Sequence, residues 1–275
     1  MNKYLFCGVT FHNDMIALIP TLAQHSYYYG SQYGSSYGAG MYSELTLIGL
    51  ALVLITAFIG YAIQAGLKNA FHRYAQEPAP LTGADAARLM LQQYGLDNVQ
   101  VISTPGRLTD HYNPQDRTVN LSESVYNEAS VAAIAVAAHE CGHAVQHARA
   151  YAWLGLRSAL VPTVNIGSRL GQILLLAGLG LVAAGASTTV AWIGLALYAT
   201  TTLFALVTLP VEFDASRRAL AWLEQSGLAT RVMHGQAGTA LRWAAMTYVA
   251  AALSSLAMLL YYAFILLSRM SNSRD

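Results

Sequence analysis

Charged residues are scarce in this sequence. Asp, Glu, Lys and Arg together make up 11% of its 275 residues, whereas soluble domains carry about 25%. Hydrophobic residues account for 55%, so the composition is that of a membrane protein rather than of a soluble domain. The formal net charge is only +1, which leaves no excess of positive charge for a nucleic-acid partner.

Cysteine is also nearly absent. The two cysteines, Cys7 and Cys141, lie far apart in the chain, and this excludes both a disulfide framework and a C-x-x-C metal site. Any metal site must therefore be built from histidines and carboxylates. We interpret Cys141 as a small buried residue rather than as a ligand.

Long apolar runs are present in four places. About 20 apolar residues in a helix cross a bilayer whose hydrocarbon core is ~30 Å thick, and each run is about that long. The runs cover residues 45–67, 170–186, 189–209 and 243–267. We therefore expect a mainly α integral membrane protein with about four transmembrane helices, of which the second and third form a hairpin.

Residues 68–169 have the pattern of a small folded portion outside the bilayer. Short strands are predicted at 99–102 and 118–121, with a polar loop at 108–114 between them. An alanine-rich run then predicts a helix from about Ser130 to His147. The apolar part of this helix is too short to span a bilayer, so we expect the helix to lie at the membrane surface.

The alanine-rich helix carries His139-Glu140-Cys141-Gly142-His143, which has the pattern H-E-x-x-H. Residues four apart lie on one face of a helix, so the two histidine rings can point to one spot and bind a divalent metal, usually zinc. Glu140 lies about 100° round the helix from His139, where a general base acting on a metal-activated water must sit. Gly142 leaves room for the close approach of another element.

A hydrolytic zinc site usually has three protein ligands, so a third ligand must be found. His147 lies about 12 Å along the helix from the first histidine, too far for one zinc ion to reach all three. The third ligand of the metzincin class would fall at Arg149, which excludes that class. Glu212 is a better candidate, because it opens a polar helix that we expect at 210–225, directly after the third span. Two spans lie between His143 and Glu212, so the chain returns to the same face of the membrane.

Basic residues indicate the orientation in the membrane. With four spans, Lys3, Arg269 and Arg274 fall on one side, and the other 12 of the 15 Lys and Arg residues fall on the opposite side. The positive-inside rule then puts the polar portion in the cytoplasm and both termini outside.

Four separated motifs carry a family resemblance. They are His139-Glu-Cys-Gly-His-Ala-Val-Gln146, Leu108-Thr-Asp-His-Tyr-Asn-Pro114, Arg157-Ser-Ala-Leu-Val-Pro162 and Leu209-Pro-Val-Glu-Phe-Asp-Ala-Ser216. Together they resemble the neutral zinc metallopeptidase family of bacterial membranes (YugP-like), over about residues 44–267. The resemblance implies a gluzincin-type endopeptidase of the bacterial inner membrane. We expect the small α+β gluzincin-like catalytic portion to lie at the membrane surface, because the motif helix is too short to span, and on the cytoplasmic face, because of the basic residues.

The sequence is also distantly similar to the HtpX and CAAX prenyl proteases, whose pattern is H-E-x-x-H followed by E-x-x-A-D. Glu212 matches the ligand glutamate of that pattern. Ser216 stands where those relatives have Asp, so a supporting role of a carboxylate at this position is not carried over.

The chain divides into seven segments. The first, residues 1–43, contains a stretch rich in Tyr, Gly, Ser and Gln, and such low complexity predicts disorder. We interpret it as a dispensable extension, or as the result of a start assigned upstream of a true start at Met41, in preference to an interaction tail. The other expected segments are a transmembrane helix at 44–67, the catalytic portion at 68–169, a transmembrane hairpin at 170–209, the third-ligand helix and loop at 210–242, a transmembrane helix at 243–267 and a tail at 268–275.

The expected function is hydrolysis of peptide bonds. One Zn²⁺ per chain would be bound by His139, His143 and Glu212, with Glu140 as the general base. The partners would be a peptide or protein substrate associated with the membrane, and the lipid bilayer itself.

The polar loop offers His111 and Tyr112 as candidate donors to the oxyanion that forms during hydrolysis. A purely structural role of these two residues is an equally good interpretation. The strand at 118–121 could hold an extended substrate by pairing along its edge.

Two other functions compete with this one. A site-2-type intramembrane protease would need the motif inside a span, and the polar segment before Ser130, with His147 and Arg149 after the motif, argues against it. A catalytically silent membrane scaffold that keeps a metal for folding would need four closed ligands, whereas we find three good candidates.

Overall fold

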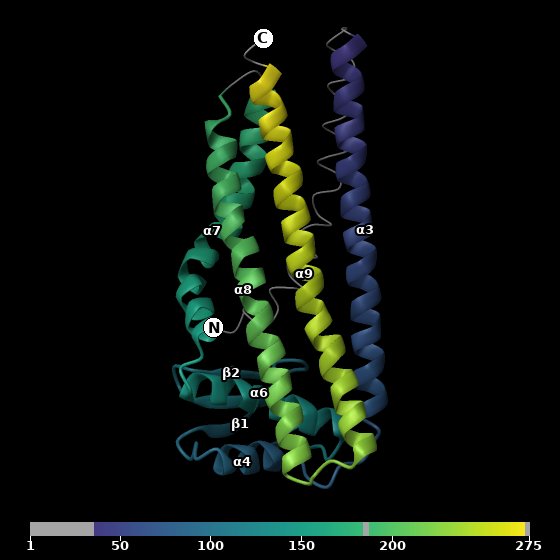
Figure 1. Cartoon of the computed structure of the whole chain (residues 1–275), viewed down its shortest axis with the longest axis vertical. Coiled ribbons are helices and arrows are strands. Elements are labelled where there is room, and N and C mark those ends of the chain that lie inside the picture. The colour runs from purple at the N-terminus through teal and green to yellow at the C-terminus, as the bar shows by residue number, and fades with distance from the viewer. Residues whose placement is uncertain (1–35, 184–186, 273–275) are drawn as a thin grey trace.

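Four long helices dominate the computed structural model, which describes residues 36–183 and 187–272 (Figure 1). These helices are α3 (Ser36–Tyr74), α7 (Ala152–Ala183), α8 (Thr189–Gln225) and α9 (Arg231–Asn272). Each is long and apolar enough to cross a membrane, as the four apolar runs of the sequence predict. The chain is therefore a mainly α integral membrane protein.

The N-terminal extension predicted at residues 1–43 can be compared with the structure only at its end. Residues 1–35 lie outside the described residues, while residues 36–43 belong to α3. The first long helix therefore begins before the apolar run from which it was predicted.

The shorter elements gather at one end of the long helices (Figure 1). They are α4 (Gly83–Gln93), β1 (Gln100–Thr104), β2 (His111–Asn113), β3 (Thr118–Ser122), α5 (Glu123–Asn127) and α6 (Val131–Ala148). The side chains of Thr82 and Ser130 accept hydrogen bonds from the backbone N–H groups of Asp85 and Ala133. These two residues thus satisfy donors that the first turns of α4 and α6 would otherwise leave without a partner.

The three strands form one sheet in the order β1-β3-β2, with β1 parallel and β2 antiparallel to β3. The segment 108–114 is therefore not entirely a loop, because His111–Asn113 pair with Thr118–Asn120. The central position of β3 also means that it is hydrogen-bonded on both sides. The prediction that residues 118–121 pair with a substrate at a free edge is wrong for this reason.

Helix α8 continues through Pro210. The sequence predicts a separate polar helix that begins at this proline, but the structure has one helix from Thr189 to Gln225. Proline has a φ value that suits a helix, and its main cost is one lost backbone hydrogen bond, which packed membrane helices tolerate when neighbouring groups satisfy the freed carbonyl. Helix α7 likewise runs through Pro162 and begins at Ala152, well before the hairpin predicted from residue 170.

Two groups of buried apolar side chains hold these elements together. The first lies at the end that holds the sheet, where Met90 of α4 and Ile134 of α6 pack in one cluster with Leu223 of α8. The second lies between the long helices and includes Leu175 and Met258. The short elements at the sheet end therefore share one apolar core with the membrane helices and do not form a separate domain.

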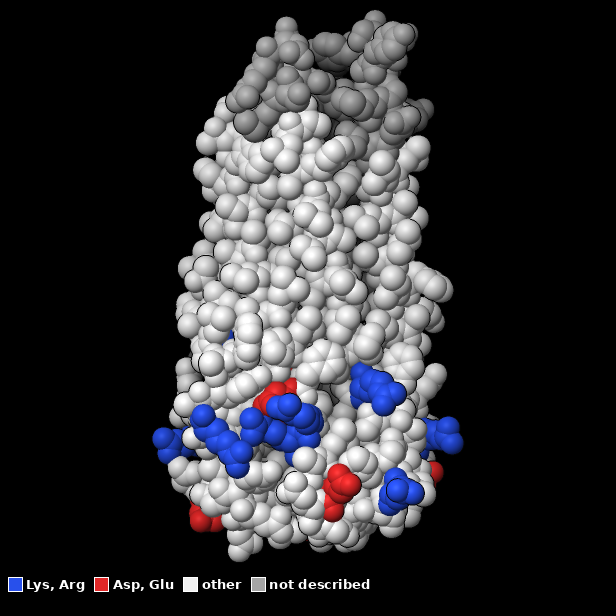
Figure 2. All heavy atoms as spheres, viewed as in Figure 1, with Lys and Arg blue, Asp and Glu red and all other residues white. Residues whose placement is uncertain are grey.

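Charged side chains are concentrated at the end that holds the sheet. Figure 2 shows this distribution on the visible face, where the surface of the long helices away from that end is nearly free of charge. Large apolar side chains are exposed on the long helices, among them Phe58, Ile166 and Leu260. In a bilayer these side chains meet lipid, so the uncharged part of the molecule lies in the membrane and the charged end lies outside it.

The packing of α7 against α8 can be tested at Gly194. A Cβ atom at this position would lie 2.2 Å from the backbone nitrogen of Leu175. We expect Gly194→Ala to push the helices apart and to lower the free energy of unfolding by about 1–3 kcal/mol, measured as a lower melting temperature in detergent. Gly180→Ala in the same hairpin is the control, because its Cβ would meet nothing within 4 Å. Equal melting temperatures of the two variants would contradict the close packing.

Candidate metal centre

Helix α6 presents His139 and His143 on one face, as the four-residue spacing predicts. Their ring centroids are 4.9 Å apart, and the two side chains are only 13% and 10% exposed. The opposite side of the helix packs in the core through Cys141, which is fully buried and donates its S–H to the carbonyl oxygen of Ala87. Burial raises the pKa of this thiol above its usual range, so the interpretation of Cys141 as a small buried residue is confirmed.

Glu212 reaches the two histidines because α8 crosses α6 at Gly142. A Cβ atom at Gly142 would lie 2.7 Å from the carbonyl oxygen of Ala215 in α8, so a residue with a side chain would hold the two backbones apart. The room that the sequence predicts at Gly142 is thus occupied by the helix that carries Glu212, whose side chain is 3% exposed.

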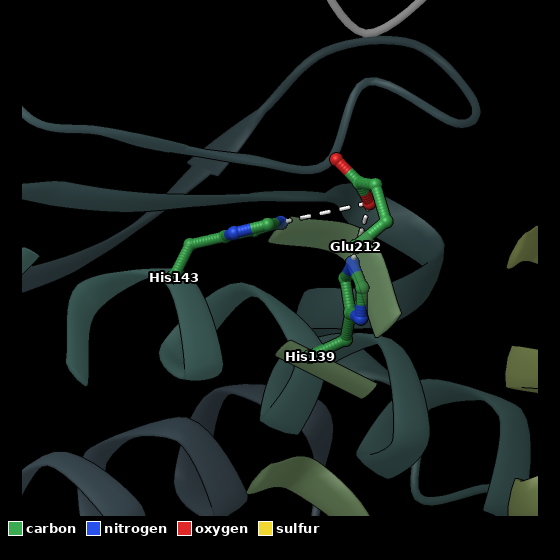
Figure 3. A group of neighbouring side chains, drawn as sticks. All are labelled: His139, His143 and Glu212. Carbon is green, nitrogen blue, oxygen red and sulfur yellow. Dashed lines mark ion pairs between the residues drawn. The ribbon is translucent and has the colours of Figure 1, made fainter. Parts of the chain in front are cut away.

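The three side chains converge on one point (Figure 3). The Oε2 atom of Glu212 is 3.3 Å from Nε2 of His139 and 3.8 Å from Nε2 of His143, and the three ligand atoms lie within 4.8 Å of one another. A tetrahedral zinc site with ligand bonds of about 2.0–2.2 Å separates its donor atoms by about 3.3–3.6 Å. Two imidazole nitrogens and one carboxylate oxygen at these distances could hold a zinc ion.

The outer nitrogen of each imidazole has a hydrogen-bond partner. Nδ1 of His139 lies 3.1 Å from the hydroxyl oxygen of Ser216, and Nδ1 of His143 lies 3.0 Å from the amide oxygen Oε1 of Gln146. If each Nδ1 donates its proton to these oxygens, each Nε2 is left with a free lone pair for a metal. The Ser216 hydroxyl would then hold the ring of His139 in place.

Gln146 is itself held by α8. Its amide Nε2 donates to the carbonyl oxygen of Val211 at 2.8 Å and to Oδ2 of Asp214 at 2.9 Å. Arg217 and Arg218 both pair with the Asp214 carboxylate. Polar contacts thus connect the guanidinium groups of Arg217 and Arg218, through Asp214 and Gln146, to the ring of His143.

Glu140 is buried beside the cluster, with 4% of its surface exposed. Burial raises the pKa of its carboxyl group to about 7, and the nearby carboxylates of Asp110 and Glu212 act in the same direction. His139 and a hydrogen bond from the backbone N–H of Tyr112 oppose this rise. A carboxyl group in these surroundings can both take up and release a proton near neutral pH.

His111 and Tyr112 lie on β2, and the structure gives both of them other contacts. Nδ1 of His111 is 2.7 Å from the carbonyl oxygen of Thr109, and the hydroxyl of Tyr112 is 2.8 Å from Nδ1 of His147. The contact of Tyr112 with Glu140 is made by its backbone. Their role as oxyanion donors stays a prediction. His147 is not part of the described cluster of His139, His143 and Glu212.

Sequence reasoning missed three side chains around the centre. Nη1 of Arg157 in α7 lies 3.2 Å from Oε1 of Glu212, Tyr248 of α9 lies beside Glu212, and Gln146 supports His143 as described above. Arg157 and Gln146 occur within two of the family motifs, which is the signal that could have drawn attention to them. Tyr248 lies in an apolar run and has no such signal.

The crossing of α6 and α8 can be tested at Gly142. We expect Gly142→Ala to move α8 away from α6, because the added methyl group meets backbone atoms of Ala215. The free energy of unfolding should fall by about 1–3 kcal/mol, and the affinity for added Zn²⁺ should fall with it, as measured by competition with a chelator. Gly155→Ala is the control, since its Cβ would meet nothing within 4 Å. Unchanged zinc affinity in Gly142→Ala would show that zinc binding does not depend on the close approach of α6 and α8.

Comparison with known proteins connects this geometry to a family. The model of a family described as "Putative neutral zinc metallopeptidase" matches residues 49–267. The "Putative membrane protease YugP" of Bacillus subtilis (strain 168) is 40% identical over 230 residues, which cover 82% of this chain and 99% of that protein. No solved structure matches the chain. The extent of both matches shows that the chain belongs to this family of neutral zinc metallopeptidases of membranes.

Proposed function

We propose that this chain is a membrane-bound zinc endopeptidase of the gluzincin type, with one zinc ion held by His139, His143 and Glu212. The observation that carries the proposal is the convergence of three ligand atoms within 4.8 Å from two helices that are distant in the sequence. Three protein ligands leave one coordination position open, as in catalytic rather than structural zinc sites. This number of ligands also argues against a silent scaffold.

The chemistry divides between the metal and Glu140. A zinc ion held by His139, His143 and Glu212 would supply a Lewis acid and would lower the pKa of a bound water to about 7. Glu140 takes the proton of the attacking water and then delivers it to the leaving amine. The buried position of Glu140 and its pKa of about 7 suit a group that must accept and return a proton in one reaction cycle. The hydrogen bond from the backbone of Tyr112 supports this role by orienting the carboxyl group.

The site would act at the membrane surface. Glu212 lies about 34 Å from the start of α8 at Thr189, and Arg157 lies about 39 Å before the end of α7 at Ala183. Both distances exceed the ~30 Å of the hydrocarbon core. The motif helix α6 is not among the four candidate spans found in the described residues, which argues against an intramembrane protease of the site-2 type. A peptide or protein substrate associated with the membrane fits this location.

The positive-inside rule supports an orientation with the site in the cytoplasm of a bacterial cell. On the face that Figure 2 shows, nearly all visible Lys and Arg side chains lie at the end that holds the sheet. The rule places such an end on the cytoplasmic side of the inner membrane.

Zinc content is the first measurement to make. We expect about one zinc ion per chain in detergent-purified wild type and a clear loss in Glu212→Ala, because two imidazoles alone bind zinc weakly. Glu224→Ala is the control, since Glu224 is an exposed carboxylate on the same helix. Zinc retained in Glu212→Ala would indicate another third ligand. No zinc in wild type after purification with added zinc would overturn the proposed zinc site.

The role of Glu140 can be separated from metal binding. We expect Glu140→Gln to keep the zinc ion and to lose about 10²- to 10⁴-fold in cleavage rate, because an amide cannot accept the proton. Cleavage would be followed by mass spectrometry of a peptide library incubated with the purified protein, with zinc content measured in the same sample. Glu123→Gln, at an exposed position of α5, should behave as wild type. A wild-type rate in Glu140→Gln would show that another group is the base.

A further inference from the structure

The two oxygen atoms of the Glu212 carboxylate face different neighbours. Oε2 faces the Nε2 atoms of His139 and His143 at 3.3 and 3.8 Å, whereas Oε1 lies 3.2 Å from Nη1 of Arg157. The Glu212 side chain is 3% exposed and the Arg157 side chain 16%. The ion pair between them is therefore largely removed from water. It joins α7 to the part of α8 that carries the proposed ligand.

Such a pair restricts what the carboxylate can do. A free carboxylate can bind a metal through one oxygen or through both, and it can rotate about its last bond. A guanidinium group that holds one oxygen by a charge-assisted hydrogen bond leaves only the other oxygen for the metal and fixes the plane of the carboxylate. Because buried charges without partners are strongly unfavourable, Arg157 and Glu212 each keep the other in place.

A third helix contacts the same carboxylate. The side chain of Tyr248 in α9 lies beside Glu212, near enough to Arg157 and Glu140 to interact with their charges. Glu212 is thus held by α7 and α9 on one side and faces α6 on the other.

We propose that Arg157 is a positioning residue of the metal centre, which holds Oε1 of Glu212 so that only Oε2 faces the two histidines, with Tyr248 as a second support. The geometry of the centre then depends on the packing of α7 and α9 around α8. The proposal rests on the proposed function, because it takes His139, His143 and Glu212 as the zinc ligands. A residue that only contacted substrate would have no effect on zinc binding in the absence of substrate.

Zinc binding by the full-length protein in detergent tests this role without any substrate. Metal-free protein would be titrated with Zn²⁺ in competition with a chromophoric chelator. Loss of a hydrogen-bonded partner of a ligand typically weakens metal binding about 10- to 100-fold, and we expect this loss in Arg157→Gln. Arg157→Lys should lose less, because an ammonium group keeps the charge but not the planar fork of donors. Tyr248→Phe should weaken binding less than Arg157→Gln does.

Matched controls are available on the long helices. Arg169→Gln removes an exposed arginine from the same helix as Arg157, and Tyr61→Phe removes an exposed hydroxyl from α3. Both should bind zinc as wild type does. The visible spectrum of the Co²⁺-loaded protein is the second readout, because it responds to the number and arrangement of ligands. We expect it to change in Arg157→Gln, in which Glu212 can bring both oxygens to the metal, and to be unchanged in Arg169→Gln.

The outcomes separate this inference from the proposed function. If wild type binds zinc and Arg157→Gln binds it with the affinity and cobalt spectrum of Arg169→Gln, the positioning role is wrong and the proposed ligands stand. If wild type binds no zinc, the proposed function and the inference both fail. If Arg157→Gln does not fold, Arg157→Lys decides. An affinity between wild type and Glu212→Ala supports the positioning role, and an affinity equal to wild type overturns it.

Discussion

A carboxylate buried at the edge of a membrane bundle is the group around which the other elements are arranged. Glu212 is 3% exposed, and an ionised group in that position is stable only if other polar groups replace the water that it has lost. Arg157 does so from α7, and His139 and His143 do so from α6. Because the buried carboxylate needs polar partners, it connects α8 with α6 and α7. The contacts with α6 also bring together the atoms that could bind a metal.

The approach of two backbones makes this arrangement possible. Gly142 lets α8 lie against α6, and the apolar core of the polar end continues from α4 and α6 into the ends of α8 and α9. A hydrogen bond of 2.6 Å from the indole Nε1 of Trp222 to Oε1 of Gln93 connects α8 with α4 in addition. The small portion and the membrane helices therefore share their packing, so the position of the site relative to the bilayer follows from the long helices themselves.

Sequence reasoning succeeded where the relevant spacing is local or topological. The spacing of four residues in H-E-x-x-H predicts two rings on one face, and the number of intervening spans predicts that Glu212 returns to the same side of the membrane. The errors arise from tertiary context. The sequence predicts a helix start at Pro210, which lies inside a packed helix. It also predicts a free edge at the strand 118–121, which is in the centre of its sheet. Arg157 and Tyr248 were missed because helical periodicity contains no information on contacts between helices that are distant in the sequence. Gln146 lies one turn from His143 in α6, so its spacing could have revealed it.

The packing of α3 has a consequence for the order of synthesis. This helix packs mainly on α9, where Gly49 lies under the ring of Tyr261 and Gly66 under the ring of Trp243. Among the described helices, α3 thus has its partner in α9, which is made after α7 and α8. Tyr248, which contacts Glu212, belongs to the same late helix. A nascent chain consequently has the three proposed ligands but lacks Tyr248 beside Glu212 until α9 has been made, so α3 gains its partner and the surroundings of Glu212 are completed at the same step of synthesis.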